Sequence, residues 1–290
     1  MSLILNNKGI ASMAFNGKKV KECWFNGVKV WPNYPDLDPV IAQITKDLKT
    51  VPIHYCKFDG NTAQTPLLID GTQMSPINFI STPNSPTYKE GVGGRKALKC
   101  SYVDISLGQL AKAQHRVFIS MLIKQTTSNS TYSGVLGGTI FGLNTKGYGY
   151  ALGWGPNIQG NKIAAESYAG GAAATAYSPI AMTTNKWYHV MMEFRSPITA
   201  TGDGTPTSFL SINGSEFTKD VGAGSIGSPL DYSDLSSEQG DSYIHLGCVW
   251  QSEKKYFKGL IQDFVLWIDG RLTDAHVELL KNYYKELGVY

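Results

Sequence analysis

The segment that decides the fold runs from Tyr256 to Tyr284 and reads YFKGLIQDFVLWIDGRLTDAHVELLKNYY. Residues 259–268 alternate between two faces, as a β-strand does, and both faces are mostly apolar. Because β-branched and aromatic residues dominate, the pattern is typical of a strand covered on both sides. One face is predicted to carry Leu260, Gln262, Phe264, Leu266 and Ile268, and the other Ile261, Asp263, Val265 and Trp267.

A short helix is predicted to follow this strand. Asp269 and Gly270 both tolerate left-handed backbone angles and favour a tight turn. Thr273 can then cap the helix by accepting a hydrogen bond from one of its first N–H groups. Gly288 is suited to end the helix, after apolar residues at helical spacing at Val277, Leu280, Tyr284 and Leu287. A central strand that leads into such a helix is expected to close a β-sandwich.

The composition is that of an all-β protein with many turns. The chain of 290 residues contains 31 glycines and few long helical patterns. Its net charge is +3 with no block of like charges, which argues against a nucleic-acid binder, because such proteins cluster Lys and Arg on one face. No signal peptide is expected at Met1, and no apolar run is long enough to span a bilayer.

The four cysteines are widely spaced and form no C-x-x-C pair, so a structural zinc site is not expected. The spacing allows one or two disulfides, although single cysteines in apolar strands are more often buried thiols. The four are Cys23, Cys56, Cys100 and Cys248.

A short repeat opens the chain, with FNGKKV at residues 15–20 and FNGVKV at residues 25–30. Asn-Gly is a strong hairpin signal, because both residues accept the positive φ angles of a type I′ turn. The repeat therefore predicts a three-stranded meander over residues 1–32, with its middle strand at Lys18–Phe25. So small a sheet needs a partner surface for its aromatic residues.

A linker is predicted at residues 33–50, where prolines disfavour helix in the residues before them. It is expected to contain a short helix from Pro39 to Leu48, capped by Asp38, with Ile41, Ile44 and Leu48 on one stripe. The main domain is predicted over residues 51–290, and a chain that begins near Val51 is expected to fold by itself.

Strand-like runs separated by Gly, Pro, Asn, Asp and Ser fill this main domain, which indicates a sandwich or barrel. Two Ser/Thr/Gly-rich segments, Thr126–Ser133 and Ala169–Ser178, are predicted as long loops. The predicted strands are Ile53–Phe58, Ala97–Ile105, Arg116–Lys124, Gly134–Leu143, Gly147–Trp154, Lys162–Tyr168, Lys186–Phe194, Ser208–Ile212, Tyr243–Val249 and Gly259–Ile268.

Five of these segments resemble, in order, the strands of laminin-G-like and concanavalin A-like lectin-glucanase jelly rolls. They are IHYCKFDG at 53–60, GRKAL at 94–98, NKWYHV at 185–190, FLSING at 209–214, and KGLIQD at 258–263 with the helix that follows. The resemblance implies an all-β jelly-roll sandwich, and it covers the chain from about Val51 onward.

The N-terminal FNG-x-K-V pattern resembles the opening segment of structural proteins of tailed bacteriophages. This second resemblance covers about the first tenth of the chain. It implies a virion component, assembled in the host cytoplasm, that is attached to other virion proteins through residues 1–32 and forms a homo-oligomer. The alternative is that these residues form an edge meander of the main domain.

Glycan binding requires aromatic faces for stacking beside a few polar groups. Trp250 and Tyr256 flank a polar loop and are expected to be exposed. Tyr148, Tyr150 and Trp154 alternate on one predicted strand and offer a second platform, unless that face looks into the sandwich. The family resemblance implies a possible calcium site at one rim, for which the candidate oxygen ligands are Asp203, Asp231, Asp234 and Asp241.

An enzyme is not expected. Glycoside hydrolysis needs two carboxylates across the scissile bond, and no acidic residue stands two positions from Glu193. His189 matches a structural strand position of the jelly-roll family, which favours a hydrogen-bonded histidine over a catalytic one. The expected function is a displayed glycan-binding module for host or glycan attachment, and the alternative is a capsid or tail decoration protein without a specific ligand.

Overall fold

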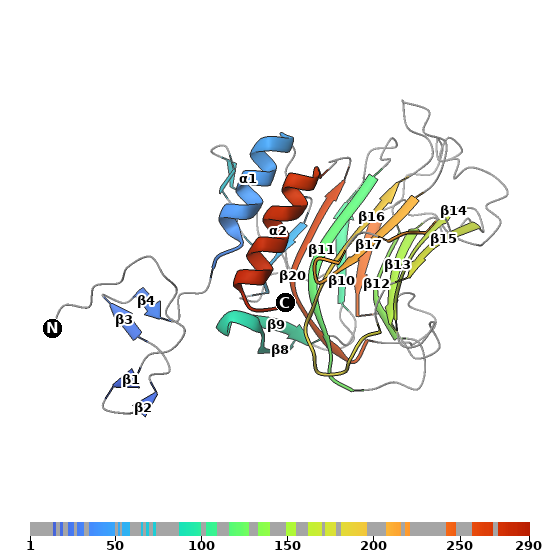
Figure 1. Ribbon diagram of the computed structural model, residues 1–290. Coiled ribbons are helices and arrows are strands. Elements are labelled where there is room, and N and C mark those ends of the chain that lie inside the picture. The colour runs from blue at the N-terminus through green and yellow to red at the C-terminus, as the bar shows by residue number, and fades with distance from the viewer. Residues whose placement is uncertain are drawn as a thin grey trace.

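The computed structural model shows an all-β jelly-roll sandwich of two antiparallel sheets, with two helices packed against one of them (Figure 1). It describes residues 14–15, 18–19, 23–25, 28–31, 35–49, 52, 54–58, 65, 68–69, 72–73, 87–99, 103–108, 116–127, 133–139, 149–154, 162–169, 172–177, 181–195, 207–215, 218–220, 242–247, 257–268 and 272–290. Among the described helices, none is long and apolar enough to cross a lipid bilayer.

The larger sheet contains eight strands in the order β18-β17-β16-β11-β20-β9-β8, with β5 also paired to β20. Its centre is β20, the strand predicted at residues 259–268, and every residue from Leu260 to Trp267 is buried. The strands are β5 His54–Cys56, β8 Thr87–Glu90, β9 Lys96–Lys99, β11 Arg116–Gln125, β16 Tyr188–Arg195, β17 Thr207–Ile212, β18 Thr218–Asp220 and β20 Gly259–Ile268.

The smaller sheet contains six strands in the order β10-β19-β12-β13-β14-β15. The predicted strand Ala97–Ile105 is divided between the two sheets, because β9 belongs to the larger sheet and β10 to the smaller one. The predicted loop at 169–178 is wrong, since residues 172–177 form the edge strand β15. The strands are β10 Val103–Gly108, β12 Ser133–Thr139, β13 Gly149–Trp154, β14 Ile163–Ala169, β15 Ala172–Tyr177 and β19 Ser242–Leu246.

Helix α2, Asp274–Glu286, confirms the predicted terminal helix and its cap. The Thr273 hydroxyl accepts a hydrogen bond from the His276 N–H, and the His276 Nδ1 accepts one from the Thr273 N–H. At the other end Gly288 has φ +80°, with bonds from Val289 N–H to the Tyr284 carbonyl and from Gly288 N–H to the Lys285 carbonyl. These two bonds form a Schellman motif, which explains why the helix ends there.

Helix α1, Asp38–Leu48, packs into the core that α2 and the larger sheet share. The predicted stripe is correct at Ile41 and Ile44, which are fully buried, but they lie in the main hydrophobic core and not in a linker. Asp38 is in the first turn rather than at the N-cap, which is Leu37. The Asp36 carboxylate accepts from the Asp38 N–H at 3.2 Å and takes over the capping role.

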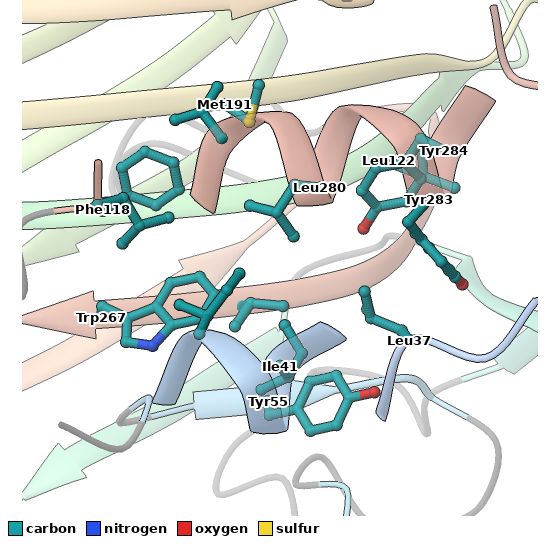
Figure 2. Packing of buried hydrophobic residues seen from close by; sticks show 14 of the residues in the cluster. Leu37, Ile41, Tyr55, Phe118, Leu122, Met191, Trp267, Leu280, Tyr283 and Tyr284 are labelled. Carbon is teal, nitrogen blue, oxygen red and sulfur yellow. The ribbon is translucent and has the colours of Figure 1, made fainter. Parts of the chain in front are cut away.

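The core under the helices lies on the outer face of the larger sheet, which we call the helix-covered face (Figure 2). Figure 2 shows Leu280 of α2 between Phe118 and Leu122 of β11 and Trp267 of β20. The rings of Phe118 and Trp267 meet edge to face, with centroids 5.9 Å apart. Leu37 and Ile41 approach from the α1 side, so the two helices and the sheet share one core.

A bulge in β20 corrects the predicted assignment of its faces. Ser120 pairs with Val265 and Leu122 pairs with Gln262, so that Met121 alone lies opposite Asp263 and Phe264. Directly paired residues share a face, and Gln262 therefore lies on the same side as Val265 and not with Phe264 as the alternation predicted. The backbone change occurs at Asp263, whose φ is +55°.

Asp263 is fully buried and forms an ion pair with Arg95, at 2.7 Å between Oδ2 and Nη2. The Gln262 side chain binds Val92 in the turn before β9. Its Oε1 accepts a hydrogen bond from the Val92 N–H at 2.8 Å, and its Nε2 donates one to the Val92 carbonyl at 3.2 Å. The Arg95 guanidinium also lies over the Tyr283 ring, 5.7 Å from its centroid. The bulge thus joins the β8–β9 hairpin, the central strand and α2.

Among the described N-terminal residues, β1 pairs with β2 and β3 pairs with β4. Residues 20–22, in the predicted middle strand, lie outside the described part. In Figure 1 both hairpins lie apart from the sandwich and the helices. Their strands are β1 Ala14–Phe15, β2 Lys18–Lys19, β3 Cys23–Phe25 and β4 Val28–Trp31, and a further small hairpin follows α1 as β6 Leu68–Ile69 and β7 Thr72–Gln73.

Candidate functional site

The strand directions define two ends of the sandwich. At one end β11 finishes at Gln125 and β20 begins at Gly259, its direct partner. We call this the Gln125 end, and the opposite end, where β11 begins at Arg116 opposite Arg195, the Arg116 end. Ligands usually bind at loops that are held on a rigid scaffold, so the loops at each end of the sandwich determine where a ligand can bind.

Backbone hydrogen bonds hold several connections together at the Gln125 end. The Thr126 N–H and hydroxyl both donate to the Lys258 carbonyl at 2.9 Å, and the Asn185 N–H donates to the Gln125 carbonyl at 2.7 Å. These hydrogen bonds hold one residue of each of three connections close together at this end: β11–β12, β15–β16 and β19–β20.

The β19–β20 connection has closely spaced, fixed ends. The Phe257 N–H donates to the Gly247 carbonyl at 2.7 Å, and the Phe257 side chain is fully buried. A Cβ at Gly259 would lie 2.3 Å from the Phe257 ring and 2.4 Å from the Lys124 carbonyl, so this position requires glycine. Residues 248–256, called here the 248–256 connection, join these two fixed positions and lie outside the described part of the chain.

Two of the predicted glycan-binding residues, Trp250 and Tyr256, belong to the 248–256 connection. Both residues, and Tyr148 as well, lie outside the described part of the chain. Trp154 is the last residue of β13 and pairs with Ser133, which places its backbone at the Gln125 end. Tyr150 pairs with Gly138, farther toward the Arg116 end. The Trp154 backbone therefore lies at the same end as Gly247 and Phe257, and the Tyr150 backbone lies farther from them.

The predicted calcium ligands belong to connections that leave the other end of the sandwich. Asp203 lies between β16 and β17, whose residues Arg195 and Thr207 pair at the Arg116 end. Asp231, Asp234 and Asp241 lie between β18 and β19, and all four aspartates lie outside the described residues. Within the described part of the chain, no group of three or more His, Cys, Asp or Glu side chains is placed to hold a metal ion.

A Ser–His pair lies under α2, where Ser120 Oγ is 3.0 Å from His189 Nε2. Both side chains are fully buried, and the Tyr284 ring packs on His189 at 3.9 Å between centroids. The His189 N–H donates to the Asn213 side chain at 2.8 Å, which ties β16 to the turn after β17. The pair has no exposed surface for a substrate, which matches the prediction of a hydrogen-bonded structural histidine.

Burial, with a smaller contribution from the nearby Lys281, lowers the pKa of His189 from 6.5 to about 3. The unfolded chain therefore binds a proton at this histidine below about pH 6.5, whereas the folded chain stays neutral there. We expect the free energy of unfolding to fall by up to about 1.4 kcal/mol for each pH unit between 6.5 and 3. Thermal unfolding from pH 7 to pH 4.5 measures this slope.

The control for this prediction is His189→Gln, which keeps a hydrogen-bonding side chain but does not titrate. The variant should be less stable at pH 7 and should lose the part of the pH slope that His189 contributes. An unchanged slope in the variant would assign the acid sensitivity to other groups.

Cys56 is a buried free thiol, as the cysteine pattern favoured, and burial raises its pKa. Cys100 and Cys248 lie outside the described residues.

Comparisons with known proteins give distant structural similarities. No family model and no curated protein matches the sequence. Domain 4 of the extracellular arabinanase AbnA from Geobacillus stearothermophilus, solved with arabinotriose, is 18% identical, with a TM-score of 0.47 over 79% of this chain and 97% of that domain. Domains LG4-5 of the mouse laminin α1 chain are 15% identical, with a TM-score of 0.39 over 67% of this chain and 47% of theirs.

The carbohydrate-binding module CBM66 from Bacillus subtilis is 13% identical, with a TM-score of 0.34 over 62% of this chain and 91% of the module. The chain's own strand order and pairing form the two sheets of the sandwich.

Proposed function

We propose that the chain is a non-enzymatic glycan-binding module, displayed on the virion of a tailed bacteriophage for attachment to host-surface or environmental glycans. The observation that carries this proposal is the Gly247–Phe257 hydrogen bond, which fixes the residues on either side of the 248–256 connection close together at the Gln125 end. Its sequence contains Trp250 and Tyr256 on either side of the polar stretch 251–255. Aromatic faces beside polar groups are what sugar rings require.

The arrangement of the helices supports this placement. Both α1 and α2 pack on the larger sheet, so its central strands are covered on that side by Leu280, Ile41 and their neighbours. The other side of the same sheet faces the smaller sheet and forms the sandwich interior. Ile163, the cross-strand partner of Trp154, is fully buried, and we therefore assign the glycan contacts first to the loop residues.

Residues 1–32 are proposed to attach the module to other virion proteins. The two hairpins are two-stranded, and sheets of this size have little stability in water without a partner surface. Their sequences carry Phe15, Trp24, Phe25 and Trp31. Assembly of several copies would place weak glycan sites close together and raise their combined affinity.

Binding of the full-length protein to a panel of glycans and bacterial envelope polysaccharides, presented multivalently, tests the loop site. We expect binding that falls at least about fivefold in Trp250→Ala, because loss of one stacking aromatic removes about 1 kcal/mol or more. Trp24→Ala makes the same exchange in the N-terminal hairpins. Because those hairpins are proposed to drive assembly, the two variants are compared by their intrinsic affinity for a soluble monovalent glycan, which Trp24→Ala should leave unchanged. Repeating the measurement with chelator tests the possible calcium site.

Equal losses in the two variants would contradict the loop site. If the protein binds no glycan in the panel, the alternative function is favoured: a capsid or tail decoration protein that needs no ligand.

A further inference from the structure

A row of residues crosses neighbouring strands at the Gln125 end of the larger sheet. Leu260 of β20 pairs with Lys124 of β11 on one side and with Lys99 of β9 on the other. Direct partners in antiparallel strands carry their side chains on the same face, so all three residues share one face. The two lysines are two strand spacings apart, or about 10 Å.

This row lies on the helix-covered face. Leu122, two residues before Lys124, is in the core under the helices. The Lys124 Nζ lies over the Trp187 ring at 4.9 Å from its centroid, and Trp187 packs partly buried against the same core. Lys99 is exposed, while Lys124 and Trp187 are half-buried. The row therefore lies on the helix-covered face of the larger sheet, just past the part of that face that the helices cover.

Two further lysines lie at the same end as this row. Lys186 and Lys258 are exposed at the same end, beside Trp187 and next to the start of β20. The ion pairs within the described part of the chain involve Lys57, Arg95, His276 and Lys281, and none of the four lysines at this end. Asp263, the described carboxylate nearest to Leu260 along β20, is already paired with Arg95.

We propose that this row binds an anionic polysaccharide, with Lys99 and Lys124 holding carboxylate or sulfate groups and Trp187 contacting a sugar ring. The proposal deepens the glycan-binding function above and names the charge class of the glycan. A polysaccharide fits better than a nucleic acid, because the net charge of the chain is only +3 and the lysines form a short row beside one aromatic ring. Gly247 and Phe257, which flank the 248–256 connection, are hydrogen-bonded to each other at the same end of the sandwich.

The test compares dextran sulfate with neutral dextran, which has the same sugar backbone, as immobilised ligands for the full-length protein. We expect selective binding to dextran sulfate that weakens about tenfold or more in the double variant Lys99→Gln/Lys124→Gln, since each lysine contributes on the order of a threefold change. The double variant Lys46→Gln/Lys49→Gln removes the same charge from exposed positions at the end of α1 and should stay within about twofold of the wild type.

Three outcomes would overturn the proposal: equal binding to dextran and dextran sulfate, equal losses in the two double variants, or equally tight binding of duplex DNA. Circular dichroism on both double variants checks that each is folded. Neutral-glycan binding that depends on Trp250 should persist in Lys99→Gln/Lys124→Gln. If only the loop proposal is wrong, Trp250→Ala will not weaken neutral-glycan binding, while Lys99→Gln/Lys124→Gln will still weaken binding to dextran sulfate. The two proposals can therefore be contradicted separately.

Discussion

A chain that begins at Val51 should lose its cooperative unfolding transition. Such a truncation removes Leu37, Ile41 and Ile44, which are fully buried in the core under the helices. Burial of each side chain of this kind contributes about 1.5–3 kcal/mol, so together they approach the 5–15 kcal/mol that stabilises a typical domain. Differential scanning calorimetry of residues 51–290 measures the effect.

The matched control is a chain of residues 35–290, which keeps α1 and removes both hairpins. It should unfold cooperatively within a few degrees of the full-length protein and should lose the assembly that we assign to residues 1–32. Asp38 is also retained there, with its hydrogen bond from the Tyr55 hydroxyl and its ion pair with Lys57 at 2.7 Å. If residues 51–290 melt at the same temperature as residues 35–290, α1 adds nothing to the core.

The packing of α1 into this core could not be predicted from the sequence. The stripe of Ile41 and Ile44 predicts that the helix buries one face, but not the surface that covers it. That surface is built from strands far along the chain, including Trp267 of β20 and Leu280 of α2. Three prolines, Pro32, Pro35 and Pro39, favoured a linker, although proline in the first turn is also compatible with a packed helix.

Local signals predicted β20 and α2 almost to the residue, because the strand alternation, the Thr273 cap and Gly288 all act within a few residues. The edge strand β15 was missed for a compositional reason. Its sequence AAATAY has low β-propensity, although Gly170-Gly171 between two runs is itself a hairpin signal that could have identified it.

The candidate site was less predictable than the fold. Trp250 and Tyr256 were singled out by their polar neighbours, while the anchoring of their loop at Gly247 and Phe257 depends on both sheets. The lysine row had no sequence signal, because Lys99 and Lys124 become neighbours only through their common partner Leu260. Net charge and charge runs report composition along the chain and not its distribution over the two ends of a sandwich.

The bulge at Asp263 was hidden because both faces of β20 are apolar, so a shift of one position left the pattern intact. Its sequence signal was the polar pair Gln262-Asp263 inside an apolar strand. Asp263 adopts the left-handed φ that a bulge commonly assigns to glycine, and its side chain is used to bind Arg95.

Asp263→Ala should therefore destabilise the protein by about 3–5 kcal/mol, because it leaves the Arg95 guanidinium largely buried without its partner. Loss of tolerance for φ +55° adds to this cost, since alanine disfavours the left-handed region by about 1–2 kcal/mol. Asp263→Asn retains that tolerance and most of the shape, and should be less destabilising than the alanine variant. Urea denaturation at constant pH measures both changes.

The double variant Arg95→Met/Asp263→Asn decides whether the ion pair itself matters. If the pair is the cause, removing both charges should recover part of the stability lost in Asp263→Asn, with a coupling energy of about 0.5–3 kcal/mol between the two positions. Strict additivity would mean that Asp263 acts through the backbone of the bulge alone. In that case Asp263→Gly, which removes the carboxylate but accepts the positive φ, should be the most stable of the single variants.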